Sequence, residues 1–171
     1  MTEPRRDVVC DAGPLIHLDE LGCLELLADF PVVWVPEAVR DEVKVHRPSA
    51  LARSTPVLRV EPVPPPSEPA VRTLIRSLAL DRGEQAALTL AAGLSHPIFL
   101  TDDSAARLAA KTLGLRAHGT LGILLRSIRR GQRSRRQVVD DLRSLPRRST
   151  LFVRRGLLEE IIRDVEHPES G

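Results

Sequence analysis

Short apolar runs alternate with longer segments of helical periodicity along most of this chain. In the longer segments apolar residues recur every three or four positions, the spacing of one helix face. Strands that alternate with helices predict an α/β fold around a central, mostly parallel sheet. The apolar runs that we predict as strands lie at residues 7–11, 32–35, 57–60, 97–100 and 115–118.

After residue 131 the pattern is helical only, with amphipathic faces at residues 138–145 and 157–165. We therefore divide the chain into an α/β domain over residues 1–131 and a helical C-terminal extension of the same domain over residues 132–171. Within the first part, Gly22 can split the first helix in two, and Pro36 is suited to the first position of the next helix. Residues 49–55 can form one further helical turn.

Two of the predicted strands end in carboxylates. Val8-Val9-Cys10 leads directly to Asp11, and Ile98-Phe99-Leu100-Thr101 leads to Asp102 and Asp103. In open parallel sheets the ligand site lies beyond the carboxyl ends of the strands, so we expect these acids to point into a site. Alternatively, Asp102 or Asp103 is the N-cap of a helix that starts near Ser104. One cap does not account for two aspartates.

Two glutamates are further candidates, and each has a structural alternative. Glu42 follows Val39 by three positions and so shares the apolar face of its helix, where it can point toward the end of the sheet or lie at the edge as a surface residue. Glu84 has capping-box spacing with Asp81. It also precedes Ala87 and Leu88, which mark the buried face, so it can point into the same crevice.

The carboxylates Asp11, Glu42, Glu84, Asp102 and Asp103 come from separate elements that the sheet brings to one end. An oxygen-rich site of this kind favours Mg²⁺ or Mn²⁺. Such ions activate water and neutralise charge in the hydrolysis of a phosphodiester, so no protein nucleophile is required. The chain has no nucleophile elbow, no phosphate-binding P-loop and no dinucleotide fingerprint. Its five histidines show no ligand spacing and are interpreted as structural or surface residues.

Positive charge is concentrated in one segment, although the net charge is only +2. Residues 126–155 contain eleven arginines against two acids, which suits a polyanionic partner such as RNA. Plain solvated helix surface is the alternative. Aromatic stacking is not expected to contribute, because three of the four aromatic residues adjoin predicted strands or core helices. The candidates for phosphate contact are Arg126, Arg129, Arg130, Arg133, Arg135 and Arg136.

The length of 171 residues suits one domain, and no apolar run approaches the roughly 18 residues of a membrane span. The first six residues lack the apolar core of a signal peptide. The two cysteines, Cys10 and Cys23, are too few for a disulfide framework and are not spaced as a metal site. We expect a protein of the cytoplasm without membrane contact.

Several segments, in this order, resemble the PIN domain, the nuclease fold of VapC-type toxins, and especially a branch of predicted nucleic-acid-binding PIN proteins. The resemblance covers roughly residues 7–131. It implies a three-layer α/β/α fold and a metal-dependent ribonuclease, with a small antitoxin protein as partner and a homodimer as the assembly. The segments are Val8 to Ile16, Pro36 to Val43, Asp81 to Glu84, Leu100 to Asp103 and Gly119 to Leu124.

The resemblance also implies that Asp11, Glu84, Asp102 and Asp103 hold the metal and that Glu42 completes the acidic pocket. Two features depart from the toxin pattern. Glu84 stands where the toxins commonly have aspartate, and either Asp102 or Asp103 can align with the family's acid after the corresponding strand. The sequence leaves that choice open.

Other classes fit less well. A phosphatase of the haloacid-dehalogenase type needs a second aspartate two residues after Asp11, where this chain has Gly13. A receiver-type phosphorylation switch places its acid pair on the first strand. The main alternative is a PIN-like protein that binds RNA or a partner without cutting it.

Overall fold

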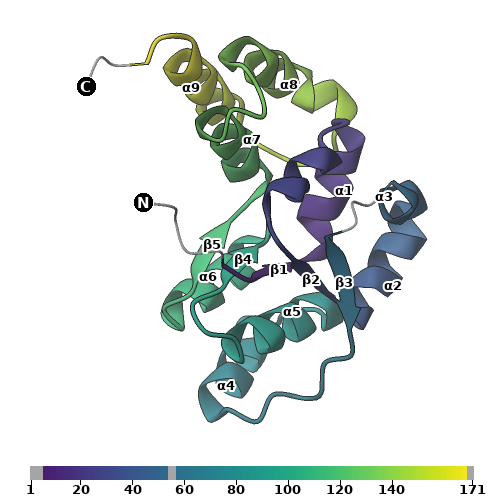
Figure 1. Cartoon of the computed structure of the whole chain (residues 1–171). Coiled ribbons are helices and arrows are strands. Elements are labelled where there is room, and N and C mark those ends of the chain that lie inside the picture. The colour runs from purple at the N-terminus through teal and green to yellow at the C-terminus, as the bar shows by residue number, and fades with distance from the viewer. Residues whose placement is uncertain (1–5, 54–56, 169–171) are drawn as a thin grey trace.

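The computed structural model describes residues 6–53 and 57–168, and its centre is a five-stranded sheet (Figure 1). Every pair of neighbouring strands is parallel, in the order β3-β2-β1-β4-β5. The predicted α/β class and the central sheet are confirmed. The strands are β1 (Val8–Cys10), β2 (Val33–Pro36), β3 (Leu58–Glu61), β4 (Ile98–Leu100) and β5 (Arg116–His118).

Helices cover both faces of the sheet, and their sides follow from the strand order. The connections from β1 to β2 and from β2 to β3 cross one face of the sheet. Those from β3 to β4 and from β4 to β5 cross the other face, because each connection is right-handed. The first layer contains α1 (Ala12–Glu20), the 3₁₀ helix η1 (Leu24–Asp29), α2 (Glu37–His46), α3 (Pro48–Ala52) and α7 (Thr120–Arg129). The second contains α4 (Pro69–Ser77), α5 (Arg82–Ala92) and α6 (Ser104–Thr112).

The central strand β1 is fully buried, and so are the last two residues of β4, because helices lie over both faces of these strands. Val8, Val9, Phe99 and Leu100 are all inaccessible to solvent. Such strands have continuous apolar runs in place of alternating patterns. The strand order reverses between β1 and β4, and the carboxyl ends of these two strands therefore open onto the switch point of the sheet.

The C-terminal helices α8 (Arg135–Arg148) and α9 (Arg155–Glu166) continue from α7 and lie above the sheet in Figure 1. The apolar face of α8 places Val138, Leu142 and Leu145 in the same buried cluster as the sheet. The helical segment after residue 131 therefore packs onto the α/β part through a shared core.

Three local predictions have clear outcomes. Gly22, at a φ of +68°, separates α1 from η1, so the first apolar segment is split. Pro36 was expected inside the following helix, and this was wrong: it is paired with Glu61 as the last residue of β2, and α2 begins one residue later. The turn expected at residues 49–55 corresponds to α3, and its last two residues lie outside the described ranges. No helix in residues 6–53 or 57–168 is long and apolar enough to cross a membrane.

The burial of β4 leads to a prediction on stability. Phe99 is fully buried in β4, whereas the side chain of Phe152 is 84% exposed. We expect Phe99→Ala to lower the free energy of unfolding by about 3–5 kcal/mol, because it leaves a cavity in the centre of the core. Phe152→Ala should change it by no more than about 0.5 kcal/mol. Urea unfolding measures both values, and similar losses for the two variants would contradict this core assignment.

Candidate active site

The predicted carboxylates meet at the carboxyl ends of β1 and β4. Asp11 directly follows β1, and its backbone N–H donates to the carbonyl oxygen of Leu100 at 2.9 Å, so the two strand ends are joined. All five predicted acids line one pocket of about 320 Å³, and Asp81 adds a sixth carboxylate. The remaining lining residues are Ala12, Gly13, His17, Thr150, Leu151 and Phe152.

Asp11 is held at the start of α1 with only 5% of its surface exposed. One carboxylate oxygen accepts from the backbone N–H of Ala12 at 2.9 Å, and the other accepts from the Thr101 hydroxyl at 3.0 Å. Burial raises the pKa of Asp11 to about 7, although these two hydrogen bonds oppose the shift. The nearby charges of Glu84 and Asp81 raise this pKa further. The pocket therefore disfavours negative charge unless a cation enters it.

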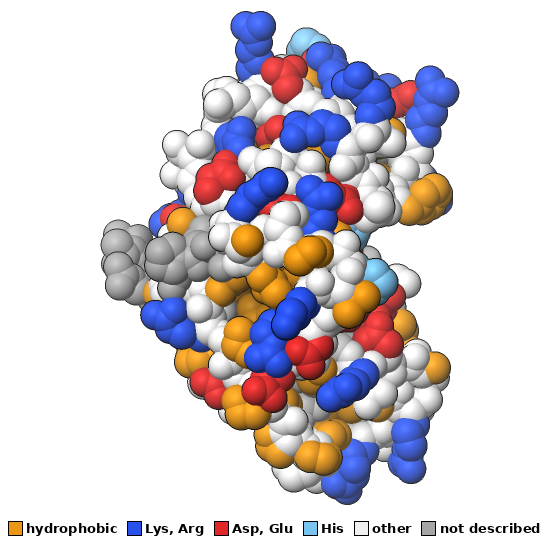
Figure 2. Space-filling view, turned by 90° about the vertical axis from the view of Figure 1, so that its right-hand side faces the viewer, with side chains coloured by type: hydrophobic (Ala, Val, Ile, Leu, Met, Phe, Trp, Pro, Cys, Tyr) orange, Lys and Arg blue, Asp and Glu red, His pale blue; other side chains and the backbone are white. Residues whose placement is uncertain are grey.

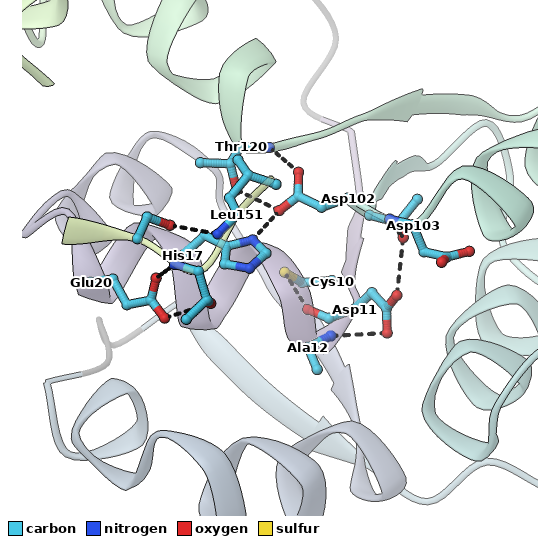
Figure 3. Close-up of polar contacts among 12 residues, drawn as sticks. Cys10, Asp11, Ala12, His17, Glu20, Asp102, Asp103, Thr120 and Leu151 are labelled. Atoms are coloured by element: carbon cyan, nitrogen blue, oxygen red, sulfur yellow. Dashed lines mark hydrogen bonds and ion pairs between the residues drawn. The ribbon is translucent and has the colours of Figure 1, made fainter. Parts of the chain in front are cut away.

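Asp102 is fixed by three protein donors, as Figure 3 shows. Oδ1 accepts from the backbone N–H of Thr120 at 2.7 Å, and Oδ2 accepts from the Thr120 hydroxyl at 2.6 Å. Nδ1 of His17 lies 2.7 Å from the same Oδ2 and donates to it, because a carboxylate can only accept. Gly119 permits this arrangement, since a Cβ there would lie 2.5 Å from Oδ1 of Asp102.

The sequence left open whether Asp102 or Asp103 caps the following helix, and the structure shows that Asp103 is the cap. Its Oδ1 accepts from the backbone N–H of Ala106 at 2.8 Å, so Asp103 is the N-cap of α6. Its own N–H donates to the hydroxyl oxygen of Thr101 at 3.1 Å. Oδ2 of Asp103 accepts no hydrogen bond within the described part of the chain. Asp103 is thus a cap that still presents one oxygen at the pocket.

Glu84 combines the two roles that were considered for it. It accepts from the backbone N–H of Asp81 at 2.9 Å through Oε2, and its own N–H donates to Asp81 at 2.8 Å, which completes the capping box of α5. It also lines the acidic pocket. Burial raises the pKa of Glu84 to about 7, with further contributions from Asp81, Asp103 and Glu42.

Glu42 points into the pocket from α2 and is half-buried, which decides against the surface alternative. Its Oε2 lies so close to α5 that a Cβ at Gly83 would be 2.7 Å away. The glycine therefore makes room for the glutamate. Burial and the charge of Asp81 raise the pKa of Glu42.

The donor chemistry of this pocket fits a hard divalent cation, because its polar lining consists mainly of carboxylates. Two of them have raised pKa values near 7. In residues 6–53 and 57–168, however, no three Asp, Glu, His or Cys side chains are already positioned around a common metal position. Asp102 and Asp11 use both carboxylate oxygens in hydrogen bonds, whereas Glu84 and Asp103 each retain one. A cation would therefore bind with some rearrangement of side chains.

Three residues that fix the acids were not identified from the sequence: His17, Thr101 and Thr120. The fully buried hydroxyl of Thr101 joins the two strand ends, because it donates to Asp11 and accepts from Asp103. His17 and Thr120 hold Asp102 across 85 and 18 residues of sequence. The signals for Thr120 were its place after Gly119 at a predicted helix start and its position in a segment that resembles the PIN domain. His17 carried none, since it lies mid-helix without ligand spacing.

The fold and the acidic pocket together define a nuclease-type α/β domain. The sequence profile of a family described as a PIN domain matches residues 7–167, and no curated protein matches the chain. The chain belongs to the PIN-domain family. The matched residues include α8 and α9 as well as the α/β part.

Three of the six predicted phosphate-binding arginines form ion pairs within the molecule, and a fourth, Arg135, donates to the carbonyl oxygen of Val165 at 3.4 Å. Arg126 and Arg130 both pair with Asp29, and Arg126 also stacks over the ring of Phe30 at 4.3 Å. Arg133 pairs with Glu25 at 2.5 Å and lies 3.8 Å from Asp141.

The other three, Arg129, Arg135 and Arg136, are exposed. Arg135 and Arg136 line a second pocket together with Arg143. Figure 2 shows basic side chains gathered on the upper part of the molecule, which carries α8 and α9.

The double role of Glu84 predicts how Glu84→Gln behaves. Glutamine keeps the cap, as Gln137 already does in α8, where its Oε1 accepts from the N–H of Ser134 at 2.8 Å. Because the folded-state pKa of Glu84 is raised to about 7, the wild type loses stability as the pH rises from about 4.5 through about 7. We expect metal-free Glu84→Gln to have the higher Tm at pH 8, by roughly 2–4 °C for each ~1 kcal/mol of relieved charge. The difference should vanish near pH 4.

Manganese should reverse this order, because at a given concentration a cation stabilises the folded state more when it binds that state more tightly. Added Mn²⁺ should raise the Tm of the wild type more than that of Glu84→Gln at pH 8. Thermal unfolding over a manganese titration measures both shifts. Equal shifts in the two proteins, with no pH dependence in their difference, would leave Glu84 with the cap as its only role.

Proposed function

We propose that this protein is a metal-dependent endoribonuclease that hydrolyses phosphodiester bonds of RNA. The observation that carries the proposal is the convergence of six carboxylates in one pocket at the switch point of a PIN-domain sheet. The pocket suits the hydrolysis of a polyanionic substrate once a bound cation offsets the negative charge of the carboxylates. The alternative is a PIN protein that binds RNA or a partner without cutting it.

Asp11, Glu84, Asp102 and Asp103 are the residues that would hold Mg²⁺ or Mn²⁺, with Glu42 as a further acid of the pocket. When bound, such a cation supplies charge neutralisation at the scissile phosphate and activation of a water molecule. Outer residues orient these acids in the way that outer-shell groups do at metal sites. Thr101 fixes Asp11, while His17 and Thr120 fix Asp102.

The biological role that we propose is the toxin of a toxin–antitoxin pair in the cytoplasm, with a small protein antitoxin and homodimeric assembly. The support is the resemblance of the sequence segments to VapC-type toxins. The thiols of Cys10 and Cys23 are free and buried, which suits a reducing compartment. Growth arrest on expression of the wild type, but not of Asp11→Asn, would test the toxic role.

Purified protein incubated with RNA and Mg²⁺ or Mn²⁺ tests the enzymatic proposal. We expect the wild type to cleave RNA with the cation present and not in chelator. Asp11→Asn should lose more activity than the roughly 10–100-fold that substitutions of outer-shell residues cost. Asp164→Asn is the matched control, because Asp164 is an exposed acid of α9 outside the pocket. Equal degradation by the wild type and Asp11→Asn would indicate a contaminant and remove the catalytic claim.

The exposed arginines predict the salt dependence of RNA binding. Arg129→Gln with Arg136→Gln should weaken binding and reduce the slope of log K against log salt by about 0.7 per lost phosphate contact. Binding is measured in chelator to prevent cleavage. The control is Arg72→Gln with Arg76→Gln, which removes the same charge from exposed positions of α4. Identical slopes for the two double variants would assign Arg129 and Arg136 to plain surface.

A further inference from the structure

An exposed aromatic ring lies at the edge of the acidic pocket. Phe152 belongs to the connection between α8 and α9, and its side chain is 84% exposed, the largest fraction among the exposed large hydrophobic residues of the described chain. It lines the same pocket as the six carboxylates. Phe30 and Phe99, by contrast, are buried in the core. Phe152 therefore contributes little to the core, and its position adjoins the proposed site of chemistry.

The backbone around Phe152 is anchored beside the pocket. Thr150 donates to Glu20 of α1 through its backbone N–H at 2.5 Å and through its hydroxyl at 2.8 Å. The N–H of Leu151 donates to the hydroxyl of Ser149 at 3.1 Å. Leu151 itself packs against the core, and Figure 3 shows it beside His17 and Asp102. The connection is thus held to α1 and to the core beside the pocket, and the ring of Phe152 projects from a held segment.

The surface outline agrees with this arrangement. In Figure 2 the right-hand edge is hollowed below the part that carries α8 and α9. Acidic side chains and a histidine lie on the lower side of the hollow, and a hydrophobic side chain projects above it. A ligand that enters this hollow meets carboxylates on one side and a projecting hydrophobic side chain on the other.

We propose that Phe152 stacks on an unpaired base of single-stranded RNA whose backbone passes the acidic pocket. This inference rests on the proposed function, and it assigns a base-contacting residue at the edge of the proposed site. An aromatic ring offers a flat face to any base, and such stacking is the usual way in which single strands are held without sequence preference. Base-paired RNA keeps its bases stacked inside the helix and cannot present a free face to the ring.

The chemistry around the ring favours a base over a protein segment. Arg154 and Arg155, which follow Phe152 by two and three residues, are exposed cations, and Arg155 pairs with Glu159 at 2.8 Å. Most of the polar groups that line the pocket are acids. The ring is therefore a single apolar contact between charged groups and lacks the wide apolar surround of a protein interface. A nucleotide fits the ring, the arginines and the acids. Its base can stack on the ring, its phosphate can contact an arginine, and its scissile bond can reach the acids once a cation is bound.

This proposal reverses the expectation that aromatic stacking does not contribute to RNA binding. Only the tertiary structure separates Phe152 from the buried aromatics, because its neighbours Leu151 and Val153 are apolar as well and the sequence alone does not say which of the three side chains faces solvent. Both of these neighbours do pack inward against the core. Phe152, which lies between them, points outward.

Tryptophan fluorescence gives a direct test, because the chain contains a single tryptophan, Trp34. Its buried Nε1 has no hydrogen-bond partner among the described residues, so Trp34→Phe removes no observed bond. In that background, Phe152→Trp places the only tryptophan at the pocket rim. Titration with single-stranded RNA in chelator should quench its fluorescence. The same sequence as a blunt duplex should not.

The affinity of Phe152→Ala for single-stranded RNA should fall by about 5- to 150-fold, while Phe152→Trp should keep or exceed the wild-type affinity. Leu108→Ala is the matched control, since Leu108 is 54% exposed on α6 and does not line the pocket. Equal affinities of Phe152→Ala and the wild type, with no quenching in Phe152→Trp, would overturn the inference.

The outcomes separate this inference from the proposed nuclease activity. RNA binding that depends on Phe152, without cleavage in Mg²⁺ or Mn²⁺, would uphold stacking and reject the enzyme. Cleavage with the same kcat/KM in the wild type and Phe152→Ala, without quenching, would uphold the enzyme and reject stacking. A dimer that is lost in Phe152→Ala while RNA affinity is unchanged would assign the ring to a second copy of the chain and reject stacking.

Discussion

The parallel pairing of β1 with β4 is the interaction on which the site depends. These strands are distant in sequence, and their register places Cys10 opposite Leu100, so the residues that follow both strands leave the sheet side by side. The Thr101 hydroxyl then joins Asp11 to the backbone of Asp103. Because the strand order reverses here, no crossover covers the opening, and the acids face a pocket.

Concentrated negative charge is the cost of this arrangement, and local hydrogen bonds make it tolerable. Four of the six acids serve the fold as well as the pocket: Asp11, Asp81 and Asp103 cap α1, α5 and α6, and Glu84 completes the capping box of α5. Helix N-termini stabilise carboxylates, so the capping positions concentrate acid at one end of the sheet without a separate framework. Burial nevertheless leaves the pKa values of Asp11 and Glu84 raised, and this residual repulsion is what a bound cation would relieve.

The basic segment shows a similar division between structure and surface. Asp29 holds Arg126 and Arg130, while Glu25 and Asp141 surround Arg133, so part of the positive charge fastens α7 and α8 to η1. The exposed arginines Arg129, Arg135 and Arg136 lie at the end of α7 and at the start of α8. An arginine count overstates the charge available to RNA, because ion pairs with acids from distant elements neutralise some of it.

The sequence by itself determined the α/β class, the order of strands and helices, and five of the six acids that line the pocket. These follow from local signals: apolar runs for buried strands, helical periodicity, and acids placed directly after strands. Roles within the site were decided by tertiary structure. Four of these roles depend on neighbours from distant elements: Asp103 rather than Asp102 caps α6, His17 and Thr120 fix Asp102, Pro36 stays in β2, and Phe152 points outward. A hydrogen bond between residues 85 positions apart produces no periodic pattern in a single sequence, and neither does the direction in which the ring of Phe152 points.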